Sequence, residues 1–333
     1  MQYRTTPVFQ RPLTVSILGG TGFVGQELTV RLARAGHSVR VLTRDPGHGD
    51  DLNTLSSVEL LAGNVYNPDF LRARIDGSDV VVNLVGILNE RGFGGAGFRR
   101  AHVELTAALL RAIAQSHVPR LLHMSALHAD AESGRSHYLR TKGEAERLVR
   151  EAGKRLDWTI FRPSVIFGPR DSLTNRFAAL LRLSAGVLPL ARAGARFAPI
   201  YVGDVVTAFM LSLYGGPTSR QSYDLCGPEV MTLEQLVRAV ARAARLPCHV
   251  LRLPDAVARL QALVMQLLPG KPFSTDNFRS LLIDSVCDRD GAGQLGLTTT
   301  RLSELAPTWL SRESWPPRPD RTRGVRPDRS AFS

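Results

Sequence analysis

Apolar and amphipathic segments alternate along the first half of the chain. An apolar run at 13–18 precedes a segment, 23–35, whose apolar residues recur at helical spacing and which Gly36 ends. Strands are expected at 38–44, 58–61, 80–85, 120–124 and 158–162, with the longest later helices at 98–117 and 138–152. Buried strands that alternate with helices predict an α/β fold with a Rossmann-type, doubly wound parallel sheet.

Past Gly168 this alternation stops, and the pattern predicts a smaller, α-rich C-terminal lobe. Asp204 is expected to cap one helix, and Thr232 to open another with Gln235 in its first turn. A third helix, 255–268, is apolar nearly all round, which favours a helix packed in the lobe over one that seeks a membrane. The expected units are a Rossmann domain at 13–170, to which 200–226 return, a lobe at 171–199 and 227–310, and a disordered basic tail at 311–333.

Composition narrows the possible partners and compartments. The net charge of +12 comes mainly from arginines spread along the chain without a nucleic-acid-binding motif, so no nucleic-acid partner is expected. No apolar run reaches the roughly 18 residues of a membrane-spanning helix, and no secretory signal is recognisable near the start. We therefore expect a cytoplasmic protein, soluble or peripheral at the inner face of a membrane.

The cysteines and histidines give no sign of a covalent frame or a metal site. Cys226, Cys248 and Cys287 are odd in number, widely spaced and without a Cys-x-x-Cys pair. This pattern favours buried thiols in a reducing cytoplasm over disulfides or zinc ligands. The eight histidines show no ligand spacing, so no metal is predicted.

A glycine-rich loop directly follows the first predicted strand and opens the first predicted helix. Its spacing, Gly-x-x-Gly-x-x-Gly, lets the backbone approach a pyrophosphate and directs the helix N-terminus at the negative charge. The sequence thus predicts a dinucleotide site. The loop residues assigned to it are Gly19, Thr21, Gly22, Phe23, Val24 and Gly25.

The end of the second predicted strand indicates which dinucleotide is bound. Enzymes selective for NAD place a carboxylate about 20 residues past the fingerprint, where it accepts from the ribose 2′-hydroxyl. Here Arg44 stands 19 residues after Gly25, and a guanidinium suits a 2′-phosphate. Asp45 follows and could rotate into the same place. NADP(H) is therefore favoured over NAD(H).

Tyr138 and Lys142 form the most informative pair in the chain. They are spaced Tyr-x-x-x-Lys, about one helical turn, so both side chains leave the same face of a predicted helix. A nearby ammonium stabilises a phenolate and makes proton exchange easier. The chain has only six tyrosines and three lysines, so chance placement of this pair is rare. The pair is a candidate for acid–base catalysis.

Taken together, these motifs resemble the extended and atypical branch of the short-chain dehydrogenase/reductase superfamily. More narrowly, the chain is similar to the NADPH-binding accessory subunits of respiratory complex I and their bacterial relatives. The likeness covers residues from about 13 to 310. The segments that carry the narrower likeness are 82–88, 138–146, 161–169 and 199–205.

The resemblance implies a role for each matching residue. Lys142 would hold the nicotinamide ribose and lower the pKa of Tyr138, which would act as general acid or base at the substrate oxygen. Ser125 would hydrogen-bond the same oxygen, although a strand-end serine can equally bond its own backbone. Asn64 stands where relatives usually carry an aspartate facing the adenine amino group. The remaining residues implied at the cofactor are Val65, Leu84, Val85, Gly86 and Pro163.

Three functions remain open from the sequence. The first is a Ser-Tyr-Lys oxidoreductase acting on a lipid-like or quinone-pathway substrate, favoured by the complete triad and an apolar lobe. The second is a non-catalytic NADPH-binding scaffold for complex I or ubiquinone-biosynthesis assembly. The third is a nucleotide-sugar epimerase or dehydratase, which Arg44 and the apolar run at 256–268 disfavour. The apolar lobe residues that motivate the first are Leu260, Leu263, Val264 and Leu267.

Overall fold

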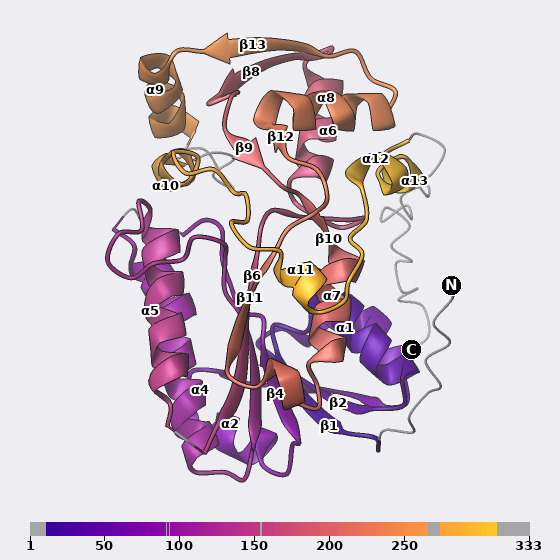
Figure 1. Ribbon diagram of the computed structural model, residues 1–333, viewed down its shortest axis with the longest axis vertical. Helices are drawn as coiled ribbons and strands as arrows, with labels where there is room; N and C mark the ends of the chain where they lie inside the picture. Colours follow the sequence, from indigo (N-terminus) through magenta and orange to yellow (C-terminus); the bar gives the residue numbers. More distant parts are fainter. Residues whose placement is uncertain (1–10, 91, 93, 154, 266–273, 312–333) are drawn as a thin grey trace, which may run out of the picture.

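Seven parallel strands form the central sheet of the computed structural model, which describes residues 11–90, 92, 94–153, 155–265 and 274–311 (Figure 1). The spatial order is β3-β2-β1-β4-β5-β6-β11. The strands are β1 (Thr14–Leu18), β2 (Ser38–Thr43), β3 (Val58–Ala62), β4 (Val80–Asn83), β5 (Arg120–Met124), β6 (Asp157–Pro163) and β11 (Gln221–Leu225). The order reverses between β1 and β4, where doubly wound sheets bind their ligands. The predicted α/β fold class is confirmed.

Helices cover both faces of this sheet (Figure 1). One buried apolar cluster, which includes Leu28 and Val206, fills the space beneath α1 and α7. A second, which includes Leu109 and Val149, lies on the opposite face. The elements of the two layers are α1 (Phe23–Arg34) and α7 (Val202–Leu211), then α2 (Pro68–Ile75), α4 (Leu105–Ala114) and α5 (His137–Glu151). Short helical elements complete this half: η1 (Pro46–Thr54), α3 (Ala96–Arg99), the π-helical turn η2 (Arg100–Glu104) and η3 (Gly216–Thr218).

A buried ion pair fixes α5 to the sheet. Glu146 is 1% exposed and accepts from the Nε of Arg162 on β6 (2.7 Å) and from Arg150 one helical turn later (2.8 Å). A buried carboxylate is stable only when it is paired in this way. Because α5 also carries Tyr138 and Lys142, the pair sets where these two side chains lie.

The C-terminal lobe stands above the carboxyl edge of the sheet (Figure 1). Two helices, α6 (Thr174–Leu183) and α8 (Leu233–Ala243), pack with β8 (Val187–Ala191) and its parallel partner β13 (His249–Leu253). The capping box of Thr232 and Gln235 opens α8, as predicted. The other elements are β7 (Ile166–Phe167), β9 (Arg196–Phe197), β10 (Ile200–Tyr201), β12 (Met231–Thr232), α9 (Asp255–Met265), α10 (Thr275–Ser280), α11 (Gly291–Gln294), α12 (Leu302–Leu305) and α13 (Pro307–Leu310).

Asp204 does not cap a helix, so that prediction was wrong. Helix α7 begins two residues earlier, at Val202, and Asp204 lies in its first turn. The carboxylate instead accepts hydrogen bonds from the backbone nitrogen (2.7 Å) and hydroxyl (3.2 Å) of Thr300. Asp204 therefore ties the last part of the described chain to α7, a long-range contact that local spacing does not reveal.

Helix α9 is not packed on all sides, contrary to the prediction. Ala258 is buried, but Leu260, Leu263 and Val264 are each about half exposed. Leu267 lies outside the described residues, as do those of the predicted tail apart from Ser311. Among the described helices, none is long and apolar enough to cross a bilayer.

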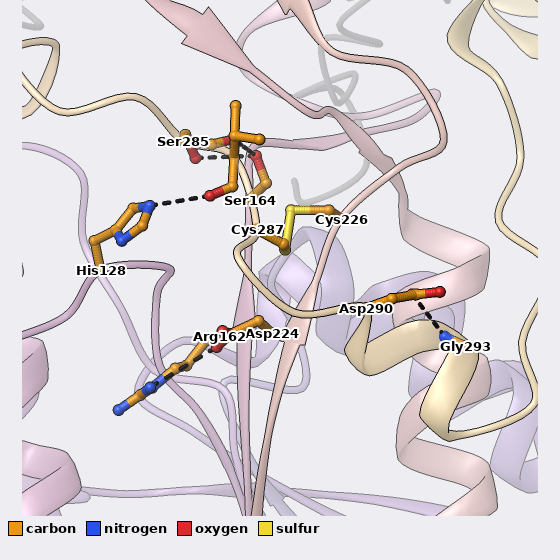
Figure 2. Close-up of a disulfide and its surroundings, with 10 residues drawn as sticks. His128, Arg162, Ser164, Asp224, Cys226, Ser285, Cys287, Asp290 and Gly293 are labelled. Carbon is orange, nitrogen blue, oxygen red and sulfur yellow. Dashed lines mark hydrogen bonds and ion pairs between the residues drawn. A yellow bond between two sulfur atoms is a disulfide. The ribbon is translucent and has the colours of Figure 1, made fainter.

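The structure joins Cys226 and Cys287 in a disulfide, so the prediction of free thiols was wrong at these two positions (Figure 2). Their Cα atoms lie 6.0 Å apart, because Cys226 directly follows β11 and Cys287 lies where the chain returns from the lobe. Nearby, the hydroxyl of Ser164 donates to the carbonyl oxygen of Ser285 (2.7 Å). A sequence separation of 61 residues gave no sign of this contact. Cys248 is a free thiol.

Candidate functional site

The glycine loop between β1 and α1 packs too tightly for side chains at two positions. Gly19 has φ of +83°, a conformation that favours glycine. A Cβ at Gly25 would lie 2.2 Å from the carbonyl oxygen of Gly19, well inside van der Waals contact. No described side chain caps α1 at Gly22, so its first N–H groups remain available to an anion. The loop therefore fits a pyrophosphate.

A cavity of about 750 Å³ extends from this loop into the C-terminal lobe. Its lobe end is largely apolar. Its inner end brings together residues that the sequence placed in two separate motifs. The predicted residues that line it are Gly19, Gly22, Phe23, Val24, Gly25, Leu84, Gly86, Ser125, Tyr138, Lys142 and Pro163.

Other predicted cofactor residues lie outside the wall of this cavity. Thr21 and Val85 adjoin lining residues, and Val65 is buried after β3. Arg44 and Asn64 are exposed at the ends of β2 and β3, and the side-chain oxygen of Asn64 accepts from the Tyr66 backbone nitrogen (3.0 Å). An amide oxygen can accept a second hydrogen bond, so an adenine contact remains possible there. The structure thus separates these residues from the catalytic candidates.

Asp45 has a structural task next to Arg44. Its carboxylate accepts from the Gly47 backbone nitrogen (3.1 Å) and caps η1. The sequence left open whether Asp45 would rotate toward the ribose. Its use as a cap leaves Arg44 as the neighbouring side chain suited to an anion.

Lys142 is buried against backbone carbonyl groups. Its Nζ donates to the carbonyl oxygens of Met124 (3.0 Å) and Val85 (3.3 Å). Burial lowers the pKa of Lys142 to about 8, and the negative charge of Glu146 opposes this shift. The ammonium therefore lies at the ends of β4 and β5, where it faces the same cavity as Tyr138.

This shift predicts how stability depends on pH. Between about pH 8 and 10.5 the unfolded chain keeps a proton on Lys142 that the folded chain has released, so this group's contribution to the free energy of unfolding rises with pH. We expect the unfolding free energy of the wild type, minus that of Lys142→Met, to increase across this window in denaturant titrations. A flat difference would mean that the buried ammonium keeps an ordinary pKa.

Tyr138 shows the opposite shift from the one implied by the family resemblance. Although part of its surface faces the cavity, burial raises the pKa of the phenol to about 12. The expectation that Lys142 lowers this pKa is therefore wrong for the ligand-free chain. The ring is held edge-on by Phe98 and His102, with centroids 6.1 and 5.5 Å away. At neutral pH this phenol is a proton donor.

Two neutral histidines lie below the lysine, and sequence reasoning missed both. The Nε2 of His102 accepts from the Ile87 backbone nitrogen (3.2 Å), so Nδ1 carries the proton and donates to the Thr141 hydroxyl (2.8 Å). Burial, with the nearby charge of Lys142, lowers the pKa of His102 to about 2 and that of His123 to about 3. Single histidines in apolar segments gave no signal of this role.

Ser125 presents an unsatisfied hydroxyl to the cavity. The residue is 3% exposed, and its Oγ has no hydrogen-bond partner among the described residues. It does not bond its own backbone, which was the structural alternative. A buried hydroxyl is costly to leave unpaired, so this atom is suited to a ligand oxygen.

The C-terminal lobe holds the end of α5 that carries Tyr138. The Asp276 carboxylate on α10 accepts from the backbone nitrogens of His137 (2.7 Å) and Tyr138 (3.2 Å). On the same helix, the hydroxyl of Ser280 donates to that of Ser136 (2.9 Å). Sequence reasoning missed Asp276 because 138 residues separate it from the tyrosine that it positions.

Comparison with known proteins agrees with this geometry. A family model described as NAD(P)H-binding matches residues 19–176. The chain is 29% identical over 284 residues to NADH dehydrogenase (ubiquinone) 1 alpha subcomplex subunit 9, mitochondrial, of Arabidopsis thaliana, a match covering 82% of this chain and 69% of that protein. It is 28% identical to the mitochondrial NADH-ubiquinone oxidoreductase 40 kDa subunit of Neurospora crassa, over 69% of this chain and 60% of that one.

A further relative and a solved structure extend the comparison. The chain is 29% identical to 4-hydroxy-2-methyl-3-oxo-4-farnesyl-3,4-dihydroquinoline-1-oxide ketoreductase of Stigmatella aurantiaca, over 47% of this chain and 51% of that protein. MoeE5, solved in complex with UDP-glucuronic acid and NAD, superimposes with a TM-score of 0.71 at 20% identity, over 89% of this chain and 97% of that one, which shows the shared fold. With its NAD(P)H-binding domain and complex I subunit relatives, the chain belongs to the extended short-chain dehydrogenase/reductase superfamily.

Proposed function

We propose that this chain is an NADP(H)-dependent oxidoreductase of the Ser-Tyr-Lys type that reduces a carbonyl group on an apolar, lipid-like or quinone-like substrate. The observation that carries the proposal is the single cavity in which the glycine loop, Ser125, Tyr138 and Lys142 meet an apolar lobe. We also propose that residues 13–170 and 200–226 hold the nucleotide, while 171–199 and 227–310 select the substrate.

The side chains divide the reaction between them. A bound reduced nicotinamide supplies a hydride to the carbonyl carbon. The Tyr138 phenol, protonated at neutral pH because of its raised pKa, donates its proton to the carbonyl oxygen, and the product is an alcohol. Ser125 Oγ donates a hydrogen bond to the same oxygen, while Lys142 supports the ribose and the phenolate that Tyr138 becomes.

The wall of the lobe supports an apolar substrate. The cavity continues past Tyr138 between α6, β8 and α10, where few charged groups occur. A relative whose name includes ketoreductase and farnesyl matches about half of the chain. Its lobe end is lined by Leu180, Leu188, Leu190, Phe197 and Leu281. Such a wall is suited to a hydrocarbon chain and poorly suited to a nucleotide sugar.

A non-catalytic scaffold is the second candidate, because the relatives in plants and fungi are named as subunits of a respiratory complex. In that case the chain would bind NADPH tightly and associate with complex I or with ubiquinone-biosynthesis proteins. Tyr138 and Lys142 would then serve nucleotide binding alone. Slow exchange of a co-purified nucleotide, without turnover, is the signature of this candidate.

Turnover distinguishes the two candidates. Purified full-length protein would be supplied with NADPH and a panel of short-chain quinones and prenylated ketones, and products identified by mass spectrometry. We expect NADPH oxidation coupled to formation of an alcohol or quinol from an apolar member of the panel. Tight NADPH binding with no product from any member would replace the enzyme proposal with the scaffold.

Cofactor preference is expected to depend on Arg44. We expect the wild type to bind NADPH more tightly than NADH, and Arg44→Glu to lose about tenfold or more in NADPH affinity, because a charge-assisted hydrogen bond contributes about 1.5–3 kcal/mol. Calorimetry with both nucleotides measures this. Arg72→Glu, on the exposed surface of α2, makes the same charge change and should leave both affinities unaltered. Equal losses in the two variants would assign the effect to net charge.

A further inference from the structure

Helix α9 carries an apolar stripe on its solvent side. The stripe consists of Val257, Leu260, Leu263 and Val264, whose exposures lie between 47% and 59%. At 100° per residue they occupy about one third of the helix circumference, so they form one continuous surface. Leu251 on β13 is exposed to a similar degree. Apolar side chains gathered in this way usually mark a binding surface.

The other side of α9 belongs to the cavity. Gln261 and Met265 line the cavity that holds Tyr138, and Ala258 is buried against Phe278 and Ala191. The helix is therefore a thin wall with the cavity behind it and the stripe in front. A surface that covers the stripe would lie one helix diameter from the apolar end of the cavity.

Positive charge surrounds the stripe in the sequence. Between residues 238 and 265 the chain carries five arginines and a single acidic residue, Asp255. Arg252 and Arg259 are exposed. Figure 1 shows α9 and β13 together at the end of the molecule farthest from β1 and β2, so a flat surface can approach them without meeting the Rossmann domain. An apolar stripe with basic neighbours complements an anionic lipid surface.

We propose that the α9 stripe docks on a bilayer that contains anionic lipid, with its four apolar side chains inserted at the headgroup boundary. A second copy of the chain fits less well, because four half-exposed side chains fall short of the roughly 800 Å² per partner that a stable interface buries. Docking does not depend on catalysis. If the proposed function holds, docking brings the apolar end of the cavity to the compartment where lipid-like substrates reside.

Vesicle binding tests the proposal directly. Full-length protein would be sedimented with vesicles of phosphatidylcholine alone and of phosphatidylcholine mixed with phosphatidylglycerol, at low and high salt. We expect binding to the mixed vesicles, weaker at high salt, and a loss of about tenfold or more in partition coefficient for Leu260→Glu/Leu263→Glu. Because both leucines face solvent, the variant should keep the wild-type circular dichroism spectrum and melting temperature.

A matched control isolates the stripe from general exposure. Leu211 on α7 is 52% exposed but lies away from α9, so Leu211→Glu should bind vesicles like the wild type. Wild-type protein that ignores both kinds of vesicle, or a double variant that binds as well as the wild type, would overturn the proposal. A dimer that light scattering detects in the wild type and not in the double variant would also overturn it, by assigning the stripe to self-association.

Discussion

Replacing Gly25 by alanine is expected to weaken nucleotide binding by about ten- to a hundredfold. The added Cβ would lie 2.2 Å from the carbonyl oxygen of Gly19 and 2.6 Å from the Cα of Gly20, so the loop and α1 must move apart. Overpacking of this kind costs about 1–3 kcal/mol. The displacement falls on the N–H groups that would face the pyrophosphate, and calorimetry with NADPH measures the resulting loss.

The interpretation requires that the variant still folds. Gly194 is the matched control, because a Cβ there meets no atom within 4 Å, and Gly194→Ala should bind nucleotide like the wild type. Circular dichroism and thermal unfolding of both variants separate a local loop effect from general loss of structure. A folded Gly25→Ala protein with wild-type affinity would show that the nucleotide does not bind at this loop.

Local patterns were sufficient for the sheet and for the inner part of the site. The strand at 120–124 has the predicted bounds, and α5 begins one residue before the predicted helix at 138–152. Both follow from periodicity within a single segment. The glycine loop and the Tyr-x-x-x-Lys pair are also local signals, and parallel topology then brings them to one edge of the sheet. The predicted strand at 80–85 ended early, because the Asn83 side chain accepts from the Val85 backbone nitrogen (3.1 Å) and turns the chain.

Contacts between distant segments could not be predicted in the same way. The Asp276 carboxylate, the bond between Cys226 and Cys287 and the contact of Asp204 with Thr300 each join elements that only the tertiary fold brings together. The exposed stripe of α9 has a different cause. An all-round apolar helix is compatible with complete burial, and only the arrangement of the lobe decides which of its faces has a neighbour.

Removing the hydroxyl of Tyr138 is expected to reduce turnover by about 10² to 10⁴ while leaving nucleotide affinity unchanged. Tyr138→Phe keeps the ring that packs against Phe98 and His102, so the local structure should persist. What disappears is the proton donated to the substrate oxygen. Steady-state kinetics with NADPH and the best substrate of the panel give the turnover, and calorimetry gives the affinity. Tyr214→Phe, whose hydroxyl binds the Arg11 carbonyl oxygen at the surface, should retain full activity.

The pH profile distinguishes the two catalytic candidates. Because the pKa of Tyr138 is raised to about 12, the phenol stays protonated through the alkaline range and should not limit kcat/KM there. Lys142, with its pKa lowered to about 8, loses its positive charge above that pH, so kcat/KM of the wild type should fall as pH rises past about 8. The residual activity of Tyr138→Phe should fall over the same range. A fall that vanishes in this variant would instead assign the titration to the phenol, with a pKa that the nucleotide or substrate has lowered.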